Sequence, residues 1–148
     1  DAAAWEAIAA ARPLSAHRMA LTERPDGVTI IDDAYNANPA SAAQALALLH
    51  DAPGPRIALL GEMLELGAER EASHRDLGER TRGLERVVFV GPSGDAVRAG
   101  NPDAEWASEE DALALARTLP RSGTVLVKAS RGMRFERLVA ALLEEAEA

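Results

Sequence analysis

Short apolar runs alternate with longer segments of helical pattern along most of the chain. The apolar runs are rich in β-branched and aliphatic side chains, which is typical of buried strands; they are residues 28–31, 56–60, 86–90 and 124–128. The segments with a helical pattern are residues 39–50, 69–82, 108–119 and 133–147. Strands that alternate with helices of this length predict crossover units and a mostly parallel sheet.

Weaker patterns predict the two edges of the sheet. Residues 17–22 alternate between polar and apolar side chains, and the turn at residues 25–27 (PDG) joins them to the next strand as an antiparallel hairpin. Residues 104–106 have the pattern of a further short strand. We therefore expect an α/β fold, with a Rossmann-like, mostly parallel sheet of about six strands, one antiparallel edge strand and helices on both faces.

We expect residues 1–148 to form a single domain. The chain has the length of one ordinary domain and shows no internal repeat or linker. Residues 1–12 have the pattern of a helix but begin without a methionine. We expect this helix to lead in from a preceding domain.

The composition of the chain argues against several classes of binding partner. Acidic residues outnumber basic ones by 24 to 16, which gives a net charge of −8 and argues against nucleic acid or a membrane surface as a partner. Cysteine is absent and the three histidines lack metal-ligand spacing, so we expect no metal site. No apolar run approaches the roughly 20 residues that span a bilayer. The expectation is a cytoplasmic monomer.

The most informative stretch is a strand at residues 28–31, a polar turn and a helix. Asn38 is a good N-cap and Pro39 suits the first helical position. This layout places ligands at the carboxyl edge of a parallel sheet, where Asp33, Tyr35, Asn36 and Asn38 would project. The alternative is an ordinary turn whose polar side chains only cap backbone groups.

A second polar cluster follows the last strand. Residues 128–132 (KASRG) hold two cations, a hydroxyl and a glycine just before a predicted helix N-terminus. Such a group suits a carboxylate or a phosphate. The alternative is that Arg131 and Arg134 pair with nearby glutamates at the surface.

The loop at residues 61–67 is less informative. It lacks the pattern of a phosphate-binding loop. Glu62 and Glu65 could act as an acid and base pair, although loop carboxylates are usually solvated. For His74, on the following helix, a solvated or capping role is favoured over catalysis.

Four segments in this order resemble the C-terminal domain of the Mur ligases, and most closely the members that add D-alanyl-D-alanine. The segments are residues 31–39 (IDDAYNANP), 60–67 (LGEMLELG), 74–79 (HRDLGE) and 127–134 (VKASRGMR). The likeness extends from Arg12 through nearly all of the remaining chain. Ala129 and Glu62 depart from the family's usual glycine and aspartate without removing a charge.

The resemblance implies the C-terminal part of an ATP-dependent ligase that forms an amide bond. In this family ATP phosphorylates the terminal carboxylate of UDP-N-acetylmuramoyl-tripeptide, and the amine of D-alanyl-D-alanine attacks the resulting acyl phosphate. The cofactors ATP and Mg2+ would be held mainly by a central domain that these residues lack. The resemblance therefore implies no catalytic residue in this chain and no activity of the chain alone.

The resemblance also assigns residues to two sides of a site. The nucleotide would be contacted on domain closure by Arg18, Asp33, Tyr35 and Asn36. The incoming substrate would be contacted by Asn38, Lys128, Ser130 and Arg131.

Two other functions stay open. One is a free-standing α/β binding or regulatory module. A receiver-like module needs an acidic cluster and a lysine at the last strand, and this pattern is matched only faintly by Asp32, Asp33 and Lys128. The other is the C-terminal domain of a folylpolyglutamate synthase-like ligase, which the sequence of residues 33–39 (DAYNANP) disfavours. A P-loop domain in the upstream reading frame would decide between a module and a ligase.

Overall fold

The computed structural model describes residues 3, 5–7, 17–119 and 122–144. Its strands are β1 (Ala20–Glu23), β2 (Thr29–Asp33), β3 (Arg56–Gly61), β4 (Arg86–Val90), β5 (Glu105–Trp106) and β6 (Thr124–Lys128). Within the described residues they form one six-stranded sheet in the order β1-β2-β6-β3-β4-β5. β1 runs antiparallel to β2, and every other neighbouring pair is parallel. The predicted fold class is confirmed.

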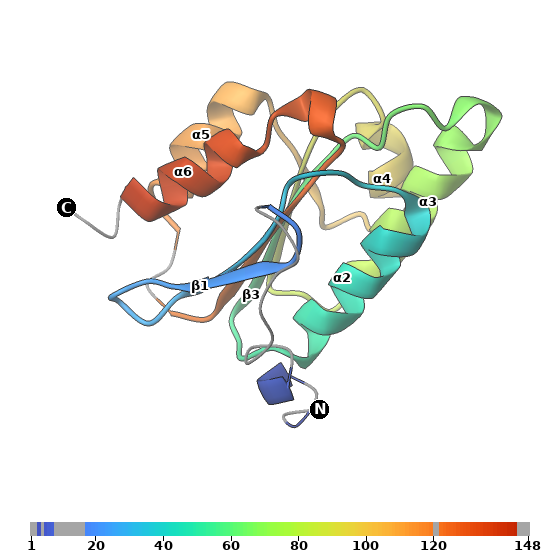
Figure 1. The fold of residues 1–148 in the computed structure, drawn as a ribbon. Coiled ribbons are helices and arrows are strands. Elements are labelled where there is room, and N and C mark those ends of the chain that lie inside the picture. Colours follow the sequence, from blue (N-terminus) through green and yellow to red (C-terminus); the bar gives the residue numbers. More distant parts are fainter. Residues whose placement is uncertain (1–2, 4, 8–16, 120–121, 145–148) are drawn as a thin grey trace.

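Helices cover both faces of this sheet (Figure 1). The helices are α2 (Pro39–Asp51), α3 (Arg70–Arg80), α4 (Gly94–Gly100), α5 (Glu109–Ala116) and α6 (Glu136–Glu144), with short 3-10 turns at Gly67–Glu69 and Arg131–Met133. α2, α3 and α4 pack on one face, and α5 and α6 pack on the other. Among the described residues, no helix is both long enough and apolar enough to cross a membrane.

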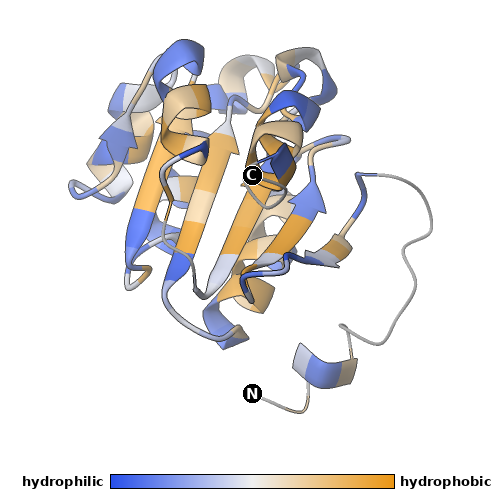
Figure 2. Cartoon of the chain, turned by 90° about the vertical axis from the view of Figure 1, so that its left-hand side faces the viewer, coloured by the Kyte–Doolittle hydropathy of each residue, from blue (hydrophilic) through white to orange (hydrophobic). Residues whose placement is uncertain are grey.

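Alternate residues of the central strands serve two separate cores. In β6, Val125 and Val127 face α5 and α6, while Leu126 faces α2, α3 and α4. Because both faces are covered, the three central residues of the strand are all apolar instead of alternating with polar residues, and Thr124 and Lys128 lie at its two ends. Figure 2 shows these hydrophobic strands at the centre of the molecule, with hydrophilic residues on the surrounding loops and helices.

Two glycines allow α3 and α4 to pack closely. A Cβ on Gly78 would lie 2.0 Å from the carbonyl oxygen of Val97, and one on Gly100 would lie 2.1 Å from that of Arg75. Backbone atoms cannot yield as side-chain ends can, so these positions accept only glycine at this helix separation.

The structure corrects several predicted boundaries; α5, for example, ends at Ala116 and not at residue 119. Two of the corrections have a clear cause in the backbone. β1 begins at Ala20 and not at residue 17, because His17 and Met19 have φ values of 62° and 48°, which interrupt an extended strand. The last helix begins at Glu136 and not at residue 133, since Arg134 has a φ of 55° and separates the 3-10 turn from α6. Of the predicted helix over residues 1–12, Ala3 and residues 5–7 are helical; the other residues, and those after 144, lie outside the described part.

Candidate functional site

A capping box fixes the chain where it leaves the sheet after β2. Asn38 Oδ1 accepts a hydrogen bond from Ser41 N at 2.8 Å, and Ser41 Oγ accepts one from Asn38 N at 3.1 Å. Pro39 follows in the first turn of α2, as predicted. These bonds set the direction of α2, so the polar residues of the turn stay at the carboxyl edge of the sheet.

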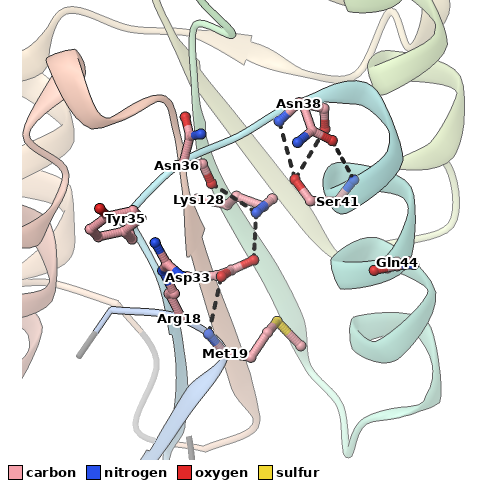
Figure 3. A pocket seen from close by; sticks show the side chains of 9 residues that line it. All are labelled: Arg18, Met19, Asp33, Tyr35, Asn36, Asn38, Ser41, Gln44 and Lys128. Atoms are coloured by element: carbon pink, nitrogen blue, oxygen red, sulfur yellow. Dashed lines mark hydrogen bonds and ion pairs between the residues drawn. The ribbon is translucent and has the colours of Figure 1, made fainter. Parts of the chain in front are cut away.

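A buried ion pair joins β2 to β6 at this edge. Lys128 is only 3% exposed, and its Nζ donates to Asp33 Oδ2 at 2.5 Å and to the carbonyl oxygen of Asn36 at 2.9 Å. The other oxygen of Asp33 accepts from Met19 N at 3.0 Å. Figure 3 shows Lys128 between Asp33 and the Asn36 backbone. The charge of Lys128 is therefore compensated inside the protein.

Two arginines approach one aromatic ring beside this pair. The guanidinium carbon of Arg18 lies 3.9 Å from the ring centroid of Tyr35, and that of Arg131 lies 5.2 Å from it. Both arginines are exposed. Neither forms an ion pair with any residue that the structure describes, so the surface pairing considered for Arg131 is absent from this part of the chain. Two uncompensated cations at one ring favour an anionic ligand.

A cleft of about 400 Å³ opens over this group of residues. Its lining, drawn in Figure 3, is Arg18, Met19, Asp33, Tyr35, Asn36, Asn38, Ser41, Gln44 and Lys128. The cleft thus brings together the residues expected on the nucleotide side with two of those expected on the substrate side. Ser130 and Arg131 do not line it.

Three of the residues that line the cleft were not predicted from the sequence. Ser41 and Gln44 lie three and six residues after Asn38, so a helical projection from the N-cap could have placed them on the same side of α2. Met19 carries no such signal, because its place depends on the pairing of β1 with β2.

Ser130 lies at the junction of three chain segments. It is 4% exposed, and its Oγ accepts from Leu64 N at 2.8 Å and lies 3.4 Å from the carbonyl oxygen of Ala37. Its backbone N–H donates to the carbonyl oxygen of Glu62 at 3.2 Å. The helix N-terminus predicted directly after residues 128–132 is wrong, since a 3-10 turn follows Ser130 and α6 begins only at Glu136.

Another polar cluster joins the loops that follow β3 and β4. Glu62 is 2% exposed; its Oε1 accepts from Ser93 N at 2.9 Å, and its Oε2 accepts from Ser93 Oγ at 2.6 Å and from Arg70 Nε at 3.1 Å. The expectation of a solvated Glu62 is therefore wrong. The carboxylate organises two loops, and its lone pairs are used by protein donors.

His74 has a structural position beside this cluster. It is fully buried, its Nε2 accepts from Met63 N at 3.0 Å, and its Nδ1 donates to the carbonyl oxygen of Arg70 at 2.7 Å. These two bonds require a neutral ring with the proton on Nδ1. Of the expected solvated or capping role, the solvated one is wrong, since His74 is buried and pairs two backbone groups, which holds the loop after β3.

Near the cleft, the carboxyl group of Asp32 has a pKa that is shifted from its usual value. Burial raises the pKa of its carboxyl group, while the N–H of Ala34 and the ring of His17 act in the opposite direction. His17 Nδ1 lies 2.6 Å from Asp32 Oδ2. This pair anchors the segment that carries Arg18. Within the described ranges, no group of three histidine or acidic side chains could hold a metal ion.

Residues 17–132 match the family described as the Mur ligase, glutamate ligase domain. The chain belongs to the Mur ligase family. It is 37% identical to the UDP-N-acetylmuramoyl-tripeptide–D-alanyl-D-alanine ligase of Escherichia coli strain K12, over 78% of this chain and 27% of that protein. It is 39% identical to the ligase of the same name from Mycobacterium tuberculosis strain H37Rv, over 94% of this chain and 33% of that protein.

Solved structures of Mur ligases have the same fold. A crystal structure of MurF ligase from Thermotoga maritima in complex with ADP matches with a TM-score of 0.79 and 31% identity, over 93% of this chain and 33% of that one. MurF from Acinetobacter baumannii matches with a TM-score of 0.78 and 28% identity, over 88% of this chain and 30% of that one. The chain spans about a third of the length of these Mur ligases. The resemblance stated from the sequence is confirmed.

Proposed function

We propose that this chain is the part of a D-alanyl-D-alanine-adding Mur ligase that receives the dipeptide and closes over the nucleotide. The observation that carries the proposal is the cleft at the carboxyl edge of β2 and β6, which is lined by the turn at residues 33–38. The relatives that align with most of this chain carry the name UDP-N-acetylmuramoyl-tripeptide–D-alanyl-D-alanine ligase. A parallel sheet places ligands at this edge.

The residues of the cleft fit part of a nucleotide. The ring of Tyr35 offers a surface for stacking, Arg18 offers an exposed guanidinium for phosphate, and Asn36 is exposed beside them. Asp33 keeps two lone-pair sites after its bonds to Lys128 and Met19, which suits a ribose hydroxyl. ATP, with Mg2+, would supply the activation of the tripeptide's carboxylate, and both would be held mainly by a domain outside this chain.

The incoming dipeptide would lie beside the nucleotide. Arg131 offers an exposed cation for its carboxylate, and Asn38 lines the cleft. Lys128 and Ser130 complete the set of four residues assigned to this side, but both are almost fully buried, Lys128 in the lining of the cleft and Ser130 outside it. The dipeptide's amine must stay free to attack, so the protein would hold the molecule by its carboxyl end.

The test is a ligation assay with the full-length enzyme that carries this chain. We expect ATP-dependent product from UDP-N-acetylmuramoyl-tripeptide and D-alanyl-D-alanine, and at least about a hundredfold lower kcat/KM with D-glutamate in place of the dipeptide. This chain alone should form no product. Glutamate addition to a folate would instead support the folylpolyglutamate synthase-like alternative, and an upstream frame without a P-loop domain would support the free-standing module.

We further propose that the enzyme acts in the cytoplasm as a monomer and has no nucleic-acid or membrane partner. The support is the net charge of −8, which disfavours binding to anionic polymers or lipid surfaces. Sedimentation of the full-length enzyme would test the monomer.

A further inference from the structure

The residues that follow β6 lie between two other loops of the site. β6 lies between β2 and β3 in the sheet, and Lys128 is in register with Asp33 of β2 and with Leu60 of β3. The residues that follow β6 therefore have the turn after β2 on one side and the loop after β3 on the other. They can bond to both at once.

Lys128 bonds to the turn after β2, and Ser130 bonds mainly to the loop after β3. Lys128 Nζ binds the Asp33 carboxylate and the Asn36 carbonyl, which are both in the turn after β2. Ser130 binds Glu62 and Leu64 in the loop after β3, and its Oγ lies near the carbonyl oxygen of Ala37. Between them the two residues connect both loops to the central strand.

Both side chains are almost fully buried and are bonded to protein groups. Lys128 and Ser130 are 3% and 4% exposed, and every bond named above is to a protein atom. Arg18, Asn36 and Arg131 are exposed at the same edge. A ligand atom can reach these three without displacing anything, whereas Lys128, although it lines the cleft, already uses two of its three N–H donors in a buried ion pair and a bond to the Asn36 carbonyl.

We propose that Lys128 and Ser130 are positioning residues, which set the geometry of the two site loops and touch neither substrate. Lys128 aligns Asp33 and the Asn36 backbone on the nucleotide side, and Ser130 fixes the loop at residues 62–64 against the turn. The inference rests on the proposed function of the cleft, and it replaces direct substrate contact for these two residues. Since Asp33 compensates the charge of Lys128, attraction of anions falls to Arg18 in the cleft lining and to Arg131, which lies near the ring of Tyr35.

The first test is a double-mutant cycle in the full-length enzyme. We expect Lys128→Met and Asp33→Asn each to lower kcat/KM for ATP by about tenfold or more, because each leaves its partner buried without a counter-charge. If Lys128 acts through Asp33, the double variant should be no more than about threefold worse than the poorer single variant. Effects that multiply to about a hundredfold, or singles with full activity, would overturn the proposal.

The second test follows the Leu64 amide by hydrogen exchange and does not depend on activity. In Ser130→Ala this amide loses its acceptor, so its exchange should become at least about tenfold faster, whereas the exposed-site control Ser122→Ala should leave it unchanged. An unchanged Leu64 rate in Ser130→Ala would contradict the proposal. This measurement also gives a result if Lys128→Met fails to fold.

Steady-state kinetics separate positioning from substrate contact. We expect Ser130→Ala to lower kcat with similar effects on kcat/KM for ATP and for the dipeptide, because a displaced loop affects the whole site. A selective rise in the dipeptide KM at unchanged kcat would show direct contact and overturn the proposal. An active wild-type enzyme that uses another amine substrate would refute the proposed function, while the exchange result at Leu64 would stand.

Discussion

The guanidinium of Arg18 lies over the ring of Tyr35, with 3.9 Å between the guanidinium carbon and the ring centroid. The two residues come from segments that also bond through their backbones, since Tyr35 N donates to the carbonyl oxygen of His17 at 2.9 Å. A cation over an exposed aromatic ring gains about 0.5–1 kcal/mol. Tyr35 thus holds Arg18 at the cleft before any ligand arrives.

Replacing Tyr35 should weaken the nucleotide side of the site. In the full-length enzyme, Tyr35→Ala should raise the KM for ATP by about fivefold to tenfold, because both the ring surface and the orientation of Arg18 are lost. Tyr35→Phe keeps the ring and should stay within about twofold of wild type. Equal effects of the two variants would mean that the hydroxyl, and not the ring face, is important.

Arg131 should affect the dipeptide more than the nucleotide. We expect Arg131→Ala to raise the KM for D-alanyl-D-alanine by about tenfold to a hundredfold, which corresponds to the roughly 1.5–3 kcal/mol of a charge-assisted hydrogen bond. The KM for ATP should change much less. Arg98→Ala, an exposed arginine on α4, is the matched control and should change neither constant. Equal shifts in both KM values would contradict the assignment to the dipeptide.

Glu62 should be important for stability. Glu62→Gln places an amide where three donor bonds from Ser93 and Arg70 now converge, so we expect a loss of about 2–4 kcal/mol in the free energy of unfolding. Urea unfolding measures it. The exposed Glu69→Gln is the control and should change stability by less than about 0.5 kcal/mol. A similarly small effect of Glu62→Gln would show that solvent reaches the cluster.

The buried carboxyl of Asp32 predicts a pH dependence of stability. Burial raises its pKa above the usual value of 3.8, so the folded state binds the proton more tightly than the unfolded state. Between these two pKa values the contribution of Asp32 to stability falls as the pH rises. We therefore expect Asp32→Asn to gain stability relative to wild type as the pH increases from about 3 to 6.

Urea unfolding at several pH values measures this effect. Asp103→Asn, at an exposed aspartate, is the control and should follow the wild-type curve. A wild-type advantage that grows with pH would show that the contact with His17 outweighs burial.

Local patterns were sufficient for most of the fold. The caps and turns act within a few residues, so Asn38 and Pro39 predict the start of α2 from the sequence alone. The apolar run within residues 124–128 likewise predicts β6, because the middle of a strand that is buried on both faces needs consecutive apolar side chains. Local reasoning failed at Arg134, whose left-handed conformation breaks a pattern that otherwise suits a continuous helix.

The interior of the site depends on contacts that no local pattern contains. Lys128 and Asp33 are 95 residues apart, and they pair because β6 inserts beside β2. In the sequence Lys128 appears as a free cation, yet in the fold it is a buried partner. The same applies to Glu62, whose loop looks exposed until Ser93, 31 residues later, closes over it. Strand order decides which polar residues remain available to ligands.

The central place of β6 has a consequence for how this chain folds during synthesis. Thr124–Lys128 is the last of the six described strands to be synthesised, yet it supplies the ladder that joins β2 to β3. Until it arrives, those two strands share no hydrogen bonds and each has an open apolar edge, which is a template for wrong pairing. The sheet can therefore close only after nearly the whole chain has been made. We expect nascent chains that stop before residue 124 to need protection by chaperones, because they lack the strand that joins the two halves.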